Sequence, residues 1–274
     1  MSFLNFLEAE QDNVFKKPLT EGPFLNLLKS RCKNSHNLAK ILPFFRVDKG
    51  PEMMLITPEH REERSKFWVD KFINELPAWK KFPSRVTCVK GHTSFDNLTS
   101  QDDAYVIIPF DGARIGVTSR ESFYKSFTSF DQFEIDRVDN KSLVTWLERL
   151  YEALSQITEK DLSFEEPKTF AQFNKCLSRL DEVIKDKMKL RKQFKEVEKL
   201  SLEHTKVVTD LLDRHCSDMK SYMSEKFDPE SNGFSCGRIE SFSRSPGNYE
   251  IWIDSPCLLI KRSKYVELYK NGNI

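Results

Sequence analysis

The stretch that decides the fold is Tyr105 to Gly116, which reads YVIIPFDGARIG. Its first four residues are aromatic and β-branched, which favours a buried strand. Pro109 then removes a backbone donor, and Asp111-Gly112 is a two-residue turn signal. Small and apolar residues resume immediately after this turn. The pattern predicts a β-hairpin at the centre of a mixed sheet.

The composition is typical of a globular protein with a charged surface, because 39% of the 274 residues are apolar and 31% are charged. The net charge of +1 gives no case for binding to nucleic acid or to a membrane surface. No apolar run approaches the ~18–20 residues that a membrane-spanning helix needs, and the first residues do not read as a signal peptide. None of the six cysteines forms a CxxC pair. We therefore expect a cytoplasmic protein with free thiols and no membrane segment.

Helices and strands alternate around the central stretch. Apolar residues at helical spacing predict helices over residues 1–42, 58–76 and 140–157. Short β-forming runs predict strands at 44–47, 85–89 and 249–260, and a strand-like tail at 265–269. This order predicts an α+β fold with an N-terminal helical region.

The composition changes between residues 168 and 227, where glycine and proline are absent and leucine recurs among charged residues. The spacing predicts one long amphipathic helix or a helical hairpin inserted into the α+β core. We therefore expect three segments: 1–167 with the N-terminal helices and the first half of the core, 168–227 as the insertion, and 228–274 as strands that complete the core. The helical region 170–226 is the candidate contact with a protein partner, although its charged face is also explained by solvation alone.

Several segments together resemble a bacteriophage family with an ADP-ribosyltransferase-like fold of the R-S/T-E type. The residues that carry the resemblance are Phe45-Arg46, Trp79 to Arg85, Thr87, Tyr105 to Gly116, and Glu250-Ile251-Trp252. Taken singly, each polar residue among them has an ordinary structural explanation. The resemblance implies a mixed ADP-ribosyltransferase-like sheet core, with the long helical segment outside it.

The resemblance also implies a chemistry, in which NAD is the substrate and no metal takes part. A strand-borne guanidinium, Arg46, would hold the anionic pyrophosphate. Thr87 would position the nicotinamide ribose or brace Glu250, which would stabilise the positive charge that develops on the ribose during cleavage. The implied cofactor-binding set is Arg46, Ser84, Arg85 and Trp252. The acceptor would be a host macromolecule, either protein or nucleic acid, in the host cytoplasm.

Two departures from the family pattern leave a second interpretation open. Val47 follows Arg46, where the family has glycine, and Asn248 lies two residues before Glu250, where arginine-modifying transferases have a second Glu or a Gln. The alternative is a catalytically inactive fold of the same kind that binds a host or virion protein. The enzymatic hypothesis requires Arg46, Thr87 and Glu250 to meet in one pocket.

Overall fold

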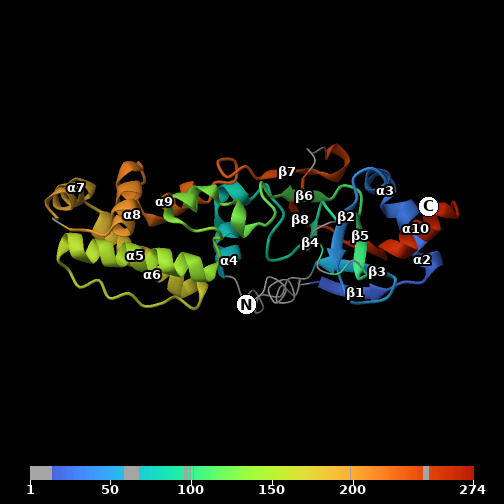
Figure 1. The fold of residues 1–274 in the computed structure, drawn as a ribbon. Helices are drawn as coiled ribbons and strands as arrows, with labels where there is room; N and C mark the ends of the chain where they lie inside the picture. Colours follow the sequence, from blue (N-terminus) through green and yellow to red (C-terminus); the bar gives the residue numbers. More distant parts are fainter. Residues whose placement is uncertain are drawn as a thin grey trace. The chain divides into compact units, whose positions relative to one another are not determined.

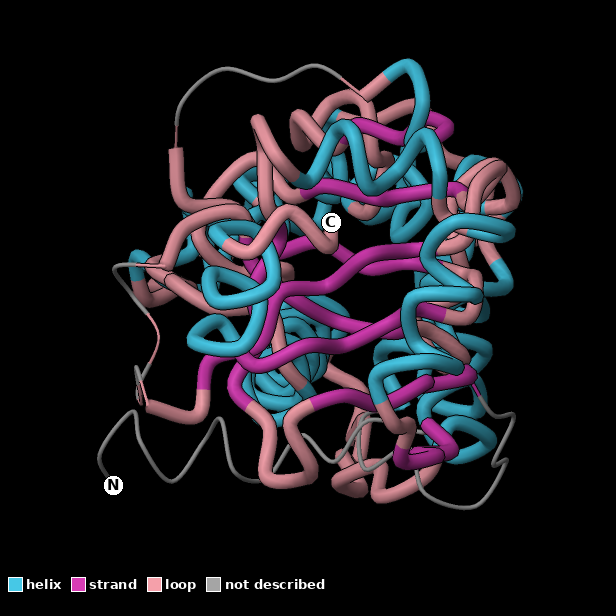
Figure 2. The backbone as a smooth tube through the Cα atoms, turned by 90° about the vertical axis from the view of Figure 1, so that its right-hand side faces the viewer, coloured by secondary structure: helices cyan, strands magenta, loops and turns pink. Residues whose placement is uncertain are grey.

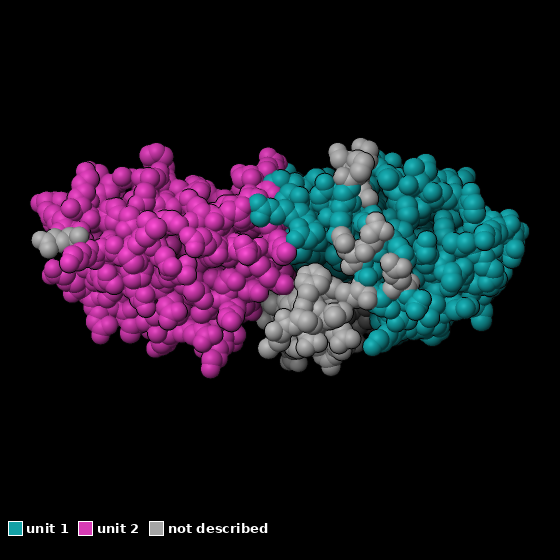
Figure 3. All heavy atoms as spheres, in the orientation of Figure 1, with its two compact units in different colours: residues 1–65, 79–123, 233–274 teal, residues 66–78, 124–232 magenta. Residues whose placement is uncertain are grey.

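The computed structural model describes residues 14–58, 68–95, 98, 100, 102–197, 199–242 and 247–274. The chain folds into two compact units, which Figure 3 draws in different colours. The first unit comprises Met1–Ser65, Trp79–Phe123 and Gly233–Ile274, and the second comprises Lys66–Ala78 and Tyr124–Asn232. The helical unit is therefore larger than the insertion expected at 168–227.

The first unit contains a nine-stranded sheet in the order β1-β3-β9-β5-β2-β4-β8-β6-β7 (Figure 1). Its strands are β1 (Val14–Pro18), β2 (Phe44–Val47), β3 (Met53–Pro58), β4 (Val89–His92), β5 (Ala104–Pro109), β6 (Arg114–Val117), β7 (Ser235–Arg238), β8 (Glu250–Ile253) and β9 (Cys257–Lys261). Every neighbouring pair in this order is antiparallel. The α+β class is confirmed, but the expectation of a mixed sheet is wrong for the strands described.

The central stretch forms two strands that do not pair with each other, so the predicted hairpin is wrong. β5 lies between β9 and β2, whereas β6 lies between β8 and β7. The turn itself is present, since Gly112 has φ 84° and the amide of Ala113 donates to the carbonyl of Phe110. The Asp111 carboxylate accepts from the amide of Ser35 at 2.9 Å, at the start of a helix. The turn thus serves a tertiary contact and leads the chain to a distant part of the sheet.

The two faces of the sheet have different surroundings, and Figure 2 shows its strands side by side in magenta. Helices α2 (Glu21–Arg31), α3 (Lys33–Ala39) and α10 (Arg262–Lys270) cover the outer face at β3, β5 and β9. Its buried strand residues include Phe45, Val106, Ile108, Leu258 and Ile260. The inner face is a separate apolar core that includes Phe44, Ile107, Ile251, Ile253 and Leu259. β3 contacts β4 although three strands separate them in the sheet, so the sheet curls around its inner face.

Several predicted boundaries of the first unit change. Part of the helix expected over 1–42 is strand β1, and β3 was not predicted. The strand expected at 85–89 begins only at Val89, and the strand-like tail at 265–269 belongs to helix α10. Residues 1–13 and 59–67, where further helix was expected, lie outside the described residues. The short 3₁₀ helix η4 (Ile239–Ser241) also belongs to this unit, and η1 (Pro77–Trp79) spans the boundary between the two units along the chain.

The second unit is helical. Its elements are α4 (Trp68–Glu75), η2 (Tyr124–Ser126), η3 (Thr128–Phe133), α5 (Asn140–Thr158), α6 (Phe170–Ile184), α7 (Lys187–Glu196), α8 (Leu202–Asp213) and α9 (Met219–Lys226). The helix predicted at 140–157 is confirmed as α5. Within the described residues, no helix is both long enough and apolar enough to cross a membrane.

Four helices, α6 to α9, occupy the region expected to be one helix or a hairpin. Each new helix starts at a side chain that accepts a hydrogen bond from a backbone amide of the first turn. Asp186 accepts from Lys189 at 2.9 Å, and Ser201 accepts from His204 at 3.1 Å. Asp218 opens α9 in the same way. These capping residues interrupt the apolar periodicity without any glycine or proline.

Candidate functional site: the Arg85–Glu250 pair

Glu250 is the first residue of β8, and the sheet register fixes the face on which its side chain lies. It is directly opposite His92 of β4, which is opposite Phe45 of β2. Residues opposite each other in neighbouring strands share a face, so Glu250 lies on the outer face with Phe45. The backbone of Glu250 is held by Thr118, whose hydroxyl accepts from the Glu250 amide at 2.9 Å.

The carboxylate of Glu250 makes two charge-assisted hydrogen bonds inside the first unit. Arg85 donates from Nη1 to Oε1 at 2.7 Å, and the backbone amide of Phe123 donates to Oε2 at 2.8 Å. The Arg85 side chain is 0% exposed and that of Glu250 is 10% exposed. Both oxygens of a nearly buried carboxylate are therefore already occupied by donors from the protein.

Aromatic rings enclose the guanidinium of Arg85. Its Cζ lies 3.9 Å from the ring centroid of Phe123 and 5.2 Å from that of Trp252. The indole of Trp252 is fixed by a 2.8 Å hydrogen bond from Nε1 to the carbonyl of Pro83. A Cβ at Gly116, the cross-strand neighbour of Trp252, would lie only 2.2 Å from the indole. The absence of a side chain at Gly116 thus leaves room for the indole of Trp252, which packs against Arg85.

Electrostatics keep Glu250 ionised. Burial alone would raise the pKa of its carboxyl, but the positive charge of Arg85, assisted by Lys90 and His92, lowers that pKa to about 2. Lys90 and His92 lie on the same face of the sheet as Glu250. At neutral pH the group is a fixed negative charge and holds no proton that it could donate to a substrate.

Arg46 lies on the other face of the sheet. It is directly opposite Tyr105, whose side chain belongs to the inner core. Its guanidinium pairs with Asp48 at 2.9 Å and donates to the carbonyl of Lys90 at 3.3 Å. Because Arg46 and Glu250 project from opposite faces, the register does not bring them into one pocket, contrary to the expectation from the sequence.

The two hydroxyl residues expected at the site lie before β4, not on a strand. Thr87 is half-buried in the bend at residues 85–87, and the Ser84 hydroxyl accepts from the amide of Val86 at 3.3 Å. The hydroxyl that holds Glu250 is that of Thr118, immediately after β6, which the sequence analysis did not single out. The sequence indicates the role of Thr118 only through its position directly after the strand Arg114–Val117.

The structure therefore divides the predicted set. Arg85 and Trp252 meet Glu250 on the outer face, where they form an ion pair flanked by aromatic rings. Arg46 is absent from this cluster, and the described contacts show no hydrogen bond from Thr87 to Glu250. The cluster can fix the start of β8, where Glu250 lies. Its charged groups form an ion pair with each other.

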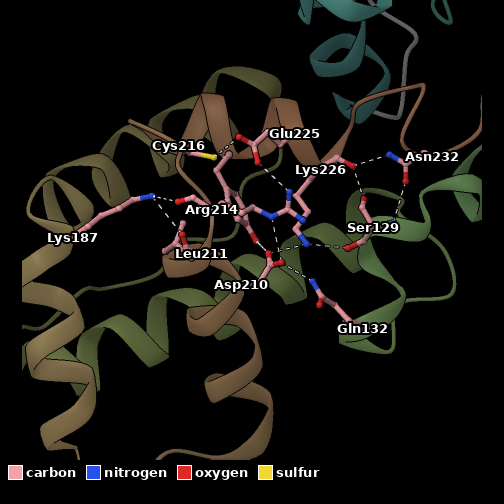
Figure 4. Close-up of polar contacts among 11 residues, drawn as sticks. Ser129, Gln132, Lys187, Asp210, Leu211, Arg214, Cys216, Glu225, Lys226 and Asn232 are labelled. Carbon is pink, nitrogen blue, oxygen red and sulfur yellow. Dashed lines mark hydrogen bonds and ion pairs between the residues drawn. The ribbon is translucent and has the colours of Figure 1, made fainter.

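A second buried ion pair lies in the second unit (Figure 4). Lys226 of α9, whose side chain is 0% exposed, pairs with Asp210 of α8 at 2.8 Å. The ammonium also donates to the carbonyl of Ser129 at 3.0 Å and lies 4.6 Å from the ring centroid of Phe133. Asp210 additionally accepts from the hydroxyl of Tyr222. This network joins α8, α9 and η3.

Among the residues that the structure describes, no group of three or more His, Cys, Asp or Glu side chains is placed to hold a metal ion. No family model matches this chain. No curated protein and no solved structure matches it either.

Proposed function

We propose that this protein acts by binding a host or virion protein and that it does not cleave NAD. The observation that carries the proposal is the sheet register, which places Arg46 on the inner face and Glu250 on the outer face. Cleavage of NAD by the expected residues needs a cation on the pyrophosphate and a carboxylate beside the ribose within one bound molecule. Side chains on opposite faces of one sheet do not meet that condition.

The state of Glu250 supports the same conclusion. A carboxylate that stabilises positive charge on a substrate must face the substrate, whereas both oxygens of Glu250 accept hydrogen bonds from Arg85 and Phe123. The Lys226–Asp210 pair has the same design in a helical unit for which no chemistry was predicted. The chain thus uses buried cation–carboxylate pairs beside aromatic rings as structural links between elements.

The test is NAD binding and turnover by the full chain. We expect no rise in melting temperature with NAD at about 1 mM, because a ligand that does not bind the folded state does not stabilise it. We also expect no transfer of label from NAD to host lysate. A melting temperature that rises with NAD concentration, or a labelled acceptor, would overturn the proposal.

A second candidate, NAD-dependent ADP-ribosyl transfer, is favoured by one observation. Arg85, Trp252 and Glu250 do meet, and Lys90 and His92 lie on the same face. In this alternative Arg85 takes the role expected of Arg46. It predicts transfer of label that Glu250→Gln abolishes while the variant keeps the circular dichroism spectrum of the parent. Transfer that survives Glu250→Gln would exclude Glu250 as the catalytic carboxylate.

A further inference from the structure

Helix α7 presents a row of lysines to solvent. Met188, which is 78% exposed, and the exposed Lys189, Lys192 and Lys195 lie at relative positions i, i+1, i+4 and i+7. These spacings place the four side chains on one face of the helix. No acidic residue occurs between Lys187 and Lys195. The exposed Glu196 ends the helix on this same face, so the row is a positive strip that runs from the exposed apolar Met188 to Lys195.

The orientation of this row is fixed by the opposite side of the helix. Leu190 is buried, with 1% exposure. Lys187 donates to the carbonyl of Arg214 at 2.9 Å, and Arg191 donates to that of Leu212, so both cations satisfy carbonyls at the C-terminal end of α8. Lys187 and Arg191 thus have structural partners within the unit. The lysine row is on the opposite, solvent-exposed side of the helix.

We propose that this lysine row docks an acidic α-helical segment of a partner protein. Lys189, Lys192 and Lys195 are three residues apart, so their side chains recur about every 4.5 Å along the helix. Glutamates at every third or fourth position of a second helix recur at the same spacing, and Met188 supplies an adaptable apolar contact at the end of the row. The proposal rests on the proposed function, because it names the chemistry of the protein that this chain binds.

The composition of the row favours an acidic protein helix over other anionic partners. Sequence-tolerant binding of single-stranded nucleic acid uses aromatic rings on which bases stack, and the exposed row has none. Insertion into a membrane surface needs a broad apolar face beside the cations, and the row has only Met188. Lysines spaced along one helix match a row of carboxylates, and the net charge of +1 provides no broad positive field for a nucleic-acid duplex.

The experiment measures binding of the full chain to a synthetic helical peptide with four glutamates on one face. The test variant is Lys189→Glu/Lys192→Glu/Lys195→Glu. The matched control is Lys141→Glu/Lys160→Glu/Lys168→Glu, which changes the net charge equally at exposed lysines elsewhere in the second unit. We expect the test variant to weaken peptide binding at least tenfold and the control to weaken it less than twofold.

Further probes give outcomes that contradict the proposal. Equal weakening by the two triple variants would show that net charge, not the row, governs binding. Tighter binding to a DNA duplex or to vesicles that contain phosphatidylserine would assign the row to a different partner. If the chain self-associates, and if this self-association is lost in the test variant but is unaffected by the peptide, the lysine row would be assigned to contact with a second copy of the chain. NAD binding is measured on the same variants, so its appearance would overturn the proposed function without changing the peptide result.

Discussion

The two units each contain a buried ion pair of nearly the same design. In the sheet unit, Arg85 and Glu250 are 2.7 Å apart with side chains 0% and 10% exposed. In the helical unit, Lys226 and Asp210 are 2.8 Å apart with side chains 0% and 11% exposed. In both, aromatic rings flank the cation. Similar burial and distance therefore occur in one pair that contains a predicted catalytic residue, Glu250, and in one pair that contains none.

The pairs differ in the cation, and that difference decides how they respond to pH. The guanidinium of Arg85 stays protonated and holds the pKa of Glu250 at about 2. The ammonium of Lys226 loses water on burial, which lowers its pKa to about 8 despite the opposing effect of Asp210. An ion pair built on arginine is permanent at physiological pH, whereas one built on a buried lysine is close to titration. A charged cluster with a shifted pKa is thus weak evidence of catalysis in this chain.

The largest expected effect comes from removing one partner of the arginine pair. Glu250→Ala leaves the charge of Arg85 buried beside Phe123 without its carboxylate, and we expect a loss of about 3–5 kcal/mol in the free energy of unfolding. Urea unfolding followed by tryptophan fluorescence measures it. Arg85→Met/Glu250→Leu removes both charges and should cost less than the single change. A double variant less stable than Glu250→Ala would show that the unpaired charge of Arg85 is not the cause of the loss.

Acid should weaken the same pair. The pKa of Glu250 is about 2 in the folded chain against an ordinary value of 4.5, so its contribution is complete above about pH 5 and is lost as the pH falls towards 2. The expected loss is on the order of 3 kcal/mol. Urea unfolding at several pH values between 6 and 3 gives the slope. Glu250→Gln, which cannot titrate, should show a shallower slope, and an unchanged slope would refute the assignment.

Alkali should increase the stability of the folded chain through the lysine pair. The folded chain releases the proton of Lys226 near pH 8, whereas the unfolded chain holds it until about 10.5, so the unfolded state binds more protons between these values. Stability should therefore rise by about 2 kcal/mol from pH 8 to pH 10. Urea unfolding followed by the helical circular dichroism signal measures this change. Lys226→Met should lose the rise, and a Lys226→Met protein that keeps it would assign the effect to another group.

The smallest effect is expected at an exposed pair in the sheet unit. Arg114 and Asp254 are 2.6 Å apart, closer than either buried pair, but their side chains are 48% and 24% exposed. Solvent screens such a pair, so Arg114→Ala should cost less than about 1 kcal/mol. The same urea titration as for Glu250→Ala measures both variants. A loss as large as that of Glu250→Ala would show that burial is not what distinguishes these pairs.

The sequence by itself determined the local character of many segments. Aromatic and β-branched runs gave strands at Phe44–Val47 and Ala104–Pro109, and helical spacing gave α5 at Asn140–Thr158. The strands and the helix follow from the preferences of neighbouring residues, which act over a few positions of the chain. The resemblance to a known family named Arg85, Glu250 and Trp252 as candidates, and the structure places the guanidinium of Arg85 against the other two. The capping residues Asp186, Ser201 and Asp218 were present in the sequence too, but regular apolar spacing masked them.

Only the tertiary structure decided which strands are neighbours and which face each side chain occupies. The turn at Asp111-Gly112 formed, but Asp111 bonds to α3, and β5 and β6 pair with strands from distant parts of the chain. Side chains alternate between faces at every residue, so the separation of Arg46 from Glu250 depends on a register set by long-range packing. No local pattern contains that register. The physical reason is that the strand register depends on which apolar face is buried, and that face is defined only when the whole sheet has formed.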